Sequence, residues 1–197
     1  MLTYEDLWDM MVSDAEGAGL EVYMIRNTME TTTCEREFRM FCAPTDAAPP
    51  YNVYAELGFV WEVDQTAASV YGPDCSFYHD EGEACPHQNA EPQGFVELEI
   101  RYSLGRPQAQ LVPSIAMEIR EVLQECIQHQ NFPQIQFLVS VLPDDRVVIH
   151  EAYATYHWEI EFYDEPVDFA GIMEEVRTVL ERLNASGLCR SEEDEEL

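Results

Sequence analysis

The sequence predicts a single α+β domain with a mostly antiparallel sheet and about three helices packed on one face of that sheet. Several segments alternate apolar and polar side chains, which is the period of a half-buried strand, and short turns join many of them. Three other segments repeat apolar residues at helical spacing, and such helices must cover the apolar side of the sheet. A chain of 197 residues can bury roughly 70% of its unfolded surface, so we expect one domain over residues 1–188, with a division into two domains near residues 72–94 as the alternative.

The first helix is predicted from its end signals. Thr3 is a suitable cap and Asp6 places an acid in the first turn, where it favours helix formation. Gly17 and Gly19 are expected to end the helix. The residues that form its apolar stripe are Leu7, Met10, Met11 and, at its edge, Trp8.

Strands are expected to follow at residues 20–27, 34–42, 53–64 and 67–71, with a proline-rich turn at 43–50. The third of these strands has the clearest alternation. Its predicted inward-facing residues are Val53, Ala55, Leu57, Phe59, Trp61 and Val63. A loop at 72–94, long for a compact domain, separates this half from the next strand at 95–104. The predicted inward-facing residues of that strand are Val96, Leu98, Ile100, Tyr102 and Leu104.

The second half of the chain alternates helices and strands. A helix is expected to start at Pro113-Ser114 and to end before Phe132-Pro133, and Asp168 is expected to cap the last helix. The predicted apolar face of the first of these helices consists of Ile115, Ile119, Val122, Leu123, Cys126 and Ile127, and that of the last helix consists of Phe169, Ile172, Met173, Val176, Leu180 and Leu183. Strands are predicted at 135–142, 147–151 and 156–162, with a hairpin turn at 143–146. Residues 189–197 read as a disordered acidic tail.

The charge of the chain restricts its partners. Its 39 acidic residues face 10 basic ones, all of them Arg, and the formal net charge is −29. Such a surface repels nucleic acid and anionic membranes and attracts basic proteins. The lack of Lys fits either a coding bias or selection against modification of Lys, and acidity also arises from adaptation to salt.

The beginning of the chain has no basic region followed by an apolar run, so no signal peptide is expected. No segment has the length and apolar character of a transmembrane helix. These features predict a cytoplasmic, intracellular protein whose cysteines are free, metal-bound or structural rather than paired.

A possible metal site lies in the 72–94 loop. Cys75, His79, Cys85 and His87 form a Cys-x3-His-x5-Cys-x-His pattern, and thiolates with imidazoles at short spacing are the ligands of tetrahedral zinc. The rival interpretations are a Cys75–Cys85 disulfide or two free thiols. An alternative function is therefore a zinc-binding domain or a metal-dependent enzyme that uses this loop.

Other catalytic patterns are missing. The sequence holds no phosphate-binding glycine loop, no nucleophile elbow and no dinucleotide fingerprint. His150-Glu151 and His157 do not match a zinc-protease helix, because their spacing is wrong and the segment has strand periodicity. Carboxylates on the strands around Glu97 and Glu159 fit a solvated sheet face better than an acid–base pair. An enzyme is therefore the less favoured interpretation.

The sequence thus predicts a non-enzymatic acidic binding protein with a basic protein partner. This chain could act as an immunity protein or inhibitor that binds a basic toxin, or as a mimic of nucleic acid whose carboxylates replace phosphates and bind a nucleic-acid-binding protein. It could also act as a chaperone-like adaptor that binds a basic secreted protein. The predicted partner-binding acids are Glu5, Asp6, Asp9, Glu97, Glu99, Glu159, Glu161, Glu174, Glu175 and Glu181.

The zinc hypothesis makes a direct prediction. The purified protein should hold one zinc per chain by metal analysis, and both Cys75→Ser and His87→Ala should lose most of it, because removal of one ligand opens the tetrahedral site. Wild-type protein without zinc would exclude this hypothesis.

Overall fold

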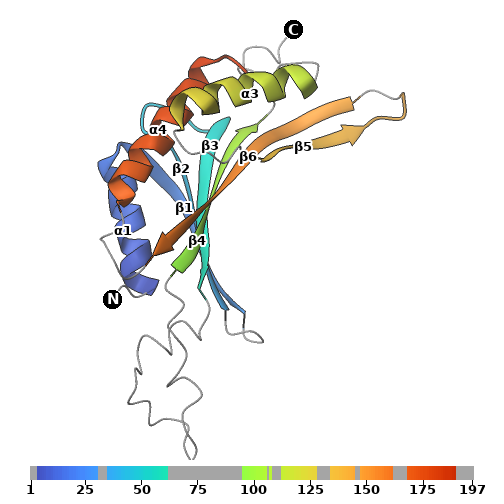
Figure 1. Cartoon of the computed structure of the whole chain (residues 1–197). Helices are drawn as coiled ribbons and strands as arrows, with labels where there is room; N and C mark the ends of the chain where they lie inside the picture. Colours follow the sequence, from blue (N-terminus) through green and yellow to red (C-terminus); the bar gives the residue numbers. More distant parts are fainter. Residues whose placement is uncertain are drawn as a thin grey trace, which may run out of the picture.

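A computed structural model describes residues 4–30, 35–61, 95–105, 107, 112–127, 134–144, 147–161 and 168–189. These residues form three helices and an antiparallel six-stranded sheet in the order β1-β2-β3-β4-β6-β5 (Figure 1). The predicted α+β arrangement is confirmed. The elements are α1 (Tyr4–Gly17), β1 (Leu20–Glu30), β2 (Glu35–Pro44), β3 (Val53–Trp61), β4 (Phe95–Gly105), α3 (Val112–Cys126), β5 (Gln134–Val141), β6 (Val147–Glu161) and α4 (Phe169–Ala185).

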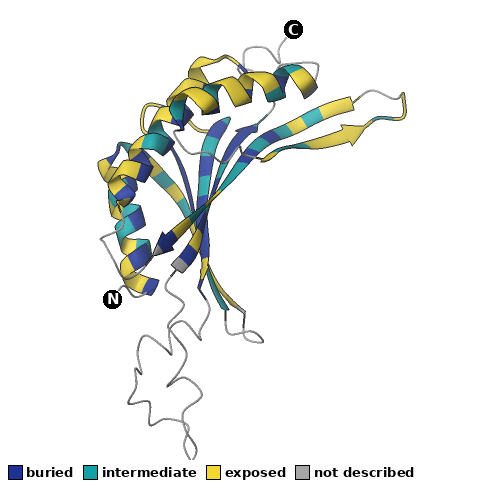
Figure 2. Ribbon diagram, viewed as in Figure 1, coloured by how far each residue is buried: buried dark blue, intermediate teal, exposed yellow. Residues whose placement is uncertain are grey.

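The core lies between one face of the sheet and the helices. α1 packs on β1 and β2, α4 packs on β2 and β3, and α4 also contacts both α1 and α3. Figure 2 shows buried residues on the sides of the helices and strands that face each other. The predicted inward-facing residues of β3 and β4 are all buried in the described part of the chain: Val53, Ala55, Leu57, Phe59, Trp61, Val96, Leu98, Ile100, Tyr102 and Leu104.

The apolar residues predicted to line one side of each helix also face the core. In α1 the predicted stripe residues Leu7 and Met11 are fully buried, and Met10 and Trp8 are partly buried against the core. In α3 the residues Ile115, Ile119 and Leu123 are buried. Every predicted core residue of α4 is buried: Phe169, Ile172, Met173, Val176, Leu180 and Leu183. Apolar burial at this spacing is what holds the three helices on the sheet.

One prediction about the strands is wrong. The segments 147–151 and 156–162 were predicted as separate strands, but Val147–Glu161 is one continuous strand that pairs with β4 from Glu151 onward. The reason lies at residues 152–155, where small Ala152 and Ala154 face the core and the larger Tyr153 faces outward. This reversal of side-chain size hides the alternation that identifies a strand.

Other predictions fall outside the described residues: the strand at 67–71, the loop at 72–94 and all of the tail beyond Cys189. Leu188 is buried, and Cys189 forms a β-bridge with Pro107. The Cys189 Sγ lies 3.6 Å from the carbonyl oxygen of Asn52. The chain therefore packs against the domain through residue 189.

Within the described ranges, no helix combines the length and the apolar character that crossing a bilayer requires. The longest described helix, α4, is amphipathic and carries exposed charged residues on its outer side. An amphipathic stripe of this kind is typical of a helix that packs on a core.

The predicted cap of α4 is confirmed. Asp168 Oδ1 accepts a hydrogen bond of 2.9 Å from the backbone N–H of Gly171, which has no partner within the helix. A Cβ at position 171 would lie 2.6 Å from Asp168 Oδ2, so glycine leaves the room that the carboxylate needs. The two residues form the cap together.

We therefore expect Asp168→Ala to lower the free energy of unfolding by about 1 kcal/mol, because the first turn of α4 loses its acceptor. Denaturant unfolding followed by circular dichroism measures the change. Asp168→Asn, which keeps a capping oxygen, is the control and should unfold close to wild type. An Asp168→Ala protein as stable as wild type would contradict this account of the cap.

Candidate functional site

The open face of the sheet, which no described helix covers, holds a network of charged side chains centred on Arg39 of β2. Arg39 lies in register with Gly58 of β3, and Gly58 lies in register with Glu99 of β4. The guanidinium reaches three carboxylates, with N–O distances of 2.7 Å to Glu37, 3.0 Å to Glu56 and 2.7 Å to Glu99. One side chain thereby links strands β2, β3 and β4.

Gly58 makes this crossing possible. A Cβ at position 58 would lie 2.8 Å from the backbone oxygen of Phe38 and 2.9 Å from Arg39 Cγ. Both separations are shorter than van der Waals contact allows. The missing side chain therefore lets the aliphatic part of Arg39 lie across β3 on its way to Glu99.

A second arginine extends the network to β6. Arg101 of β4 lies 3.1 Å from Glu151 and 3.9 Å from Glu56, and its guanidinium carbon lies 3.8 Å above the ring of Tyr153. Tyr54 Oη donates a hydrogen bond of 3.1 Å to Glu151. The central carboxylates of the open face are thus held by Arg39 and Arg101, and the paired charges join four neighbouring strands.

The electrostatics of this network keep Arg39 charged. Partial burial alone would lower the pKa of Arg39, but hydrogen bonds to Glu99 and Glu37 outweigh burial and raise that pKa above its ordinary value. Burial also raises the pKa of Tyr54, and the neighbouring Glu151 adds to this effect. A planar guanidinium with several donors suits such a site better than an ammonium group does.

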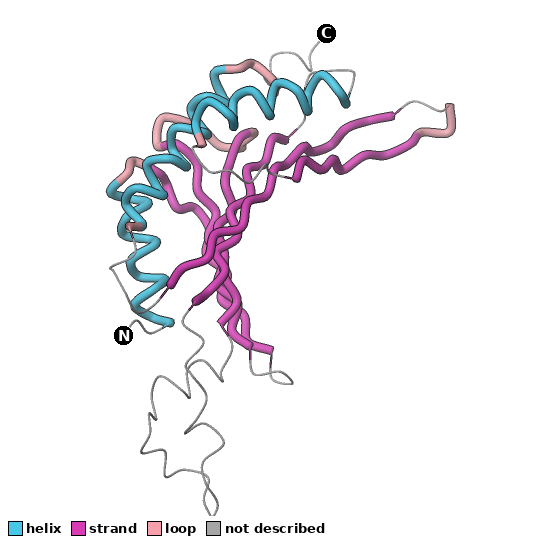
Figure 3. The backbone as a smooth tube through the Cα atoms, in the orientation of Figure 1, coloured by secondary structure: helices cyan, strands magenta, loops and turns pink. Residues whose placement is uncertain are grey.

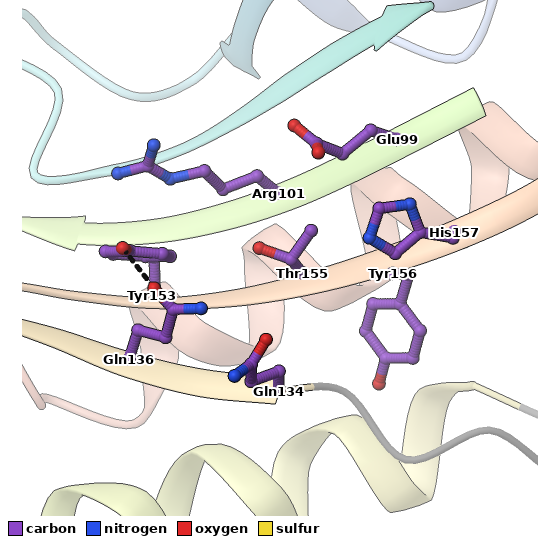
Figure 4. A pocket seen from close by; sticks show the side chains of 8 residues that line it. All are labelled: Glu99, Arg101, Gln134, Gln136, Tyr153, Thr155, Tyr156 and His157. Atoms are coloured by element: carbon purple, nitrogen blue, oxygen red, sulfur yellow. Dashed lines mark hydrogen bonds between the residues drawn. The ribbon is translucent and has the colours of Figure 1, made fainter. Parts of the chain in front are cut away.

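A cavity of about 490 Å³ adjoins the network (Figure 4). The residues that line it are Glu99, Arg101, Gln134, Gln136, Tyr153, Thr155, Tyr156 and His157. Tyr153 Oη donates to Gln136 within the lining, and His157 contacts Glu97. Glu99 is the carboxylate among the described residues that line the cavity, and it already pairs with Arg39.

The outer surface of α1, α3 and α4, which we call the helix layer, has a different charge balance. α1 contains Glu5, Asp6, Asp9, Asp14 and Glu16 and no basic residue. α4 contains Arg182 and Arg177, and Arg177 pairs with Glu174 at 3.0 Å and with Glu181 at 3.5 Å. α3 contributes Glu118, Glu121 and Glu125 and one basic residue, Arg120. Because α1 and α4 are in contact, their acids lie on neighbouring helices.

The predicted partner-binding acids therefore divide between two sides of the sheet. Those on the helix layer are Glu5, Asp6, Asp9, Glu174, Glu175 and Glu181; those on the open face are Glu97, Glu99 and Glu159. Glu97 and Glu159 lie directly opposite each other in the register of β4 and β6. Glu161 is the last residue of β6. A single partner surface cannot include both groups, because the sheet separates them.

One acid of the helix layer is also used within the fold. Glu5 accepts a hydrogen bond of 2.8 Å from Arg36, and this bond holds the pKa of Glu5 below its ordinary value. The Arg36 guanidinium carbon lies 4.0 Å above the ring of Tyr4. Arg36 thereby connects the start of α1 to β2.

The sequence did not identify Arg39, Glu37, Glu56, Arg101 and Glu151 as a connected group. Alternation along β3 did place Glu56 on the polar side of its strand. The partners of Glu56 come from other strands, however, and the register between strands is what brings them together. The glycine within an otherwise alternating strand, Gly58, was the signal that a close approach occurs there.

The predicted zinc ligands Cys75, His79, Cys85 and His87 lie outside the described residues. Elsewhere, within the ranges that the structure describes, no group of three or more His, Cys, Asp or Glu residues is arranged to hold a metal ion. Cys42, Cys126 and Cys189 hold no disulfide. Burial raises the pKa of Cys42 to about 12 and that of Cys189 to about 11. The zinc site therefore stays a prediction of the sequence.

Comparison of the chain with protein-family models, with curated proteins and with solved structures finds no match. The function must therefore be argued from the charges, contacts and exposed surfaces of the described residues.

The role of Gly58 gives a stability prediction. Gly58→Ala should lower the free energy of unfolding by about 1–3 kcal/mol, because the new Cβ overlaps the Phe38 carbonyl and pushes Arg39 away from Glu99. Gly17→Ala is the matched control, since a Cβ there meets no atom within 4 Å. Thermal and denaturant unfolding measure both variants. Equal stabilities of the two variants would contradict the argument for a required close approach.

Proposed function

We propose that this chain is a non-enzymatic acidic binding protein and that a basic protein partner docks on the helix layer, on the outer surface of α1 and α4. The candidate partners are those that fit a negative surface: a cationic toxin, a nucleic-acid-binding protein, or a basic secreted client. Direct binding of nucleic acid is disfavoured, because its phosphates would meet the same negative charge.

The observation that supports this surface is the unbalanced charge of α1. The helix holds five acids, Glu5, Asp6, Asp9, Asp14 and Glu16, in 14 residues and no basic side chain. Asp9 and Glu16 are exposed and lie seven positions apart, so they share one side of the helix. The acids of α4 lie on the adjacent helix and extend the negative field.

The open face is the weaker candidate for such a partner. Its central acids Glu37, Glu56, Glu99 and Glu151 already pair with Arg39 and Arg101. A basic partner would have to displace these arginines or leave them facing its own positive charges. Like charges brought together across an interface are unfavourable, so this face suits a basic partner less well than α1, which has no arginine.

The proposal predicts how binding depends on salt and on α1. Immobilised protein should capture a basic protein from a lysate of the source organism at low ionic strength, and most of it should be released at high ionic strength. The variant Asp9→Asn/Glu16→Gln should weaken binding of that protein roughly two- to thirtyfold, because it removes two carboxylates and each exposed ion pair contributes about 0.2–1 kcal/mol.

The control carries the same change of charge on the other side of the sheet. Glu97→Gln/Glu159→Gln removes two exposed carboxylates from β4 and β6 and should bind the captured protein within twofold of wild type. Docking on α1 would be refuted if the affinity did not depend on ionic strength, or if both double variants lost affinity to the same extent.

A further inference from the structure

The sheet has two edges, and they differ in charge. β1 forms one edge and carries Glu21, Arg26 and Glu30, whereas β5 forms the other and contains no charged residue. An edge strand presents unpaired backbone N–H and C=O groups to solvent, and charged side chains are the usual protection against pairing with another chain. β1 has this protection and β5 lacks it.

The hairpin of β5 and β6 also exposes apolar side chains. From Leu138 to Val141 every residue of β5 is exposed, and the exposed fraction is 55% for Leu138 and 68% for Val141. Val147 and Val148 of β6 are exposed beside them. Figure 3 shows this end of the hairpin extending away from the helices and from the other strands. Neighbouring exposed apolar residues of this kind mark an interaction surface.

The absence of charge here is unusual for this chain. No Asp, Glu or Arg occurs between Glu125 and Asp144, in a sequence whose net charge is −29. Two copies of such a protein repel each other over about one Debye length wherever their carboxylates face. An uncharged apolar edge is a surface on which two copies can meet without placing acids opposite acids.

We propose that the β5 edge is the interface with a second copy of this chain, formed by antiparallel pairing of β5 with β5 of the other copy. A twofold axis beside the Leu138–Val141 stretch makes the contact self-complementary and continues the sheet from one copy into the other. Pairing centred on these four residues of β5 gives a paired edge of about 14 Å at 3.4 Å per residue. The exposed leucine and valines of both hairpins are buried by the same contact.

A second copy fits this edge better than the basic partner proposed above. A basic protein finds no carboxylate on β5 to pair with, whereas identical apolar side chains on a twofold axis are complementary to each other. The two interactions also respond to salt in opposite directions. Salt weakens attraction between an acidic helix layer and a basic protein, but it relieves repulsion between two acidic copies and so favours their association.

The test measures the mass of the full chain in solution by light scattering or sedimentation, over a concentration series that reaches several hundred micromolar at low and high ionic strength. Wild-type protein should shift from 22.7 kDa to twice that mass, and at lower concentration when salt is high. Val141→Glu and Val139→Glu should each weaken the dimer at least tenfold, because each places a charge from both copies within this short apolar contact.

Met29→Glu is the matched control, since Met29 is an exposed apolar residue, 58% accessible, on the opposite edge strand. It adds the same charge and should dimerise like wild type. Circular-dichroism melting verifies that the variants fold, which exposed positions should permit. Wild-type protein that stays at 22.7 kDa under all these conditions would overturn the proposal. So would folded Val139→Glu and Val141→Glu proteins that dimerise as well as Met29→Glu does.

Discussion

A sheet that is apolar on one face only is the constraint from which the other features of this structure follow. Residues such as Leu57 and Leu98 are fully buried on that face, while Glu56 and Glu99 lie on the other. The apolar face has to be covered, and α1, α4 and α3 cover it. The acidic residues therefore lie on two surfaces, the outer side of the helices and the open face of the sheet. The sheet itself keeps these two charged surfaces apart.

The two charged surfaces are organised differently, and the position of the arginines is the cause. Arg39 and Arg101 lie in the middle of the open face, where each binds more than one carboxylate and where partial burial strengthens the pairing. α1 has no basic residue at all. The open face therefore holds a network in which two arginines bind four carboxylates and connect the strands, whereas the acids of α1 have no basic residue on their own helix.

The exposed end of the β5–β6 hairpin belongs neither to the arginine–carboxylate network of the open face nor to the acidic helix layer. It extends beyond the helices and carries Leu138, Val139 and Val141 without a charged residue in β5. Its chemistry is thus separate from that of the acidic surfaces, so self-association and binding of a basic protein can occur on different parts of one molecule. In a chain this acidic, an edge without charged residues reduces the electrostatic repulsion between two copies that meet there.

The sequence by itself determined the fold class, the inward-facing residues of β3 and β4, the three helical stripes and the Asp168 cap, because periodicity and end signals are local. It failed at β6, where Ala152 and Ala154 face the core and Tyr153 faces out, so that alternation in hydrophobic size disappears. Only the tertiary structure decided which charges meet. Arg39 reaches Glu99 because strand register aligns both residues with Gly58, and register depends on contacts between distant segments that no local pattern contains.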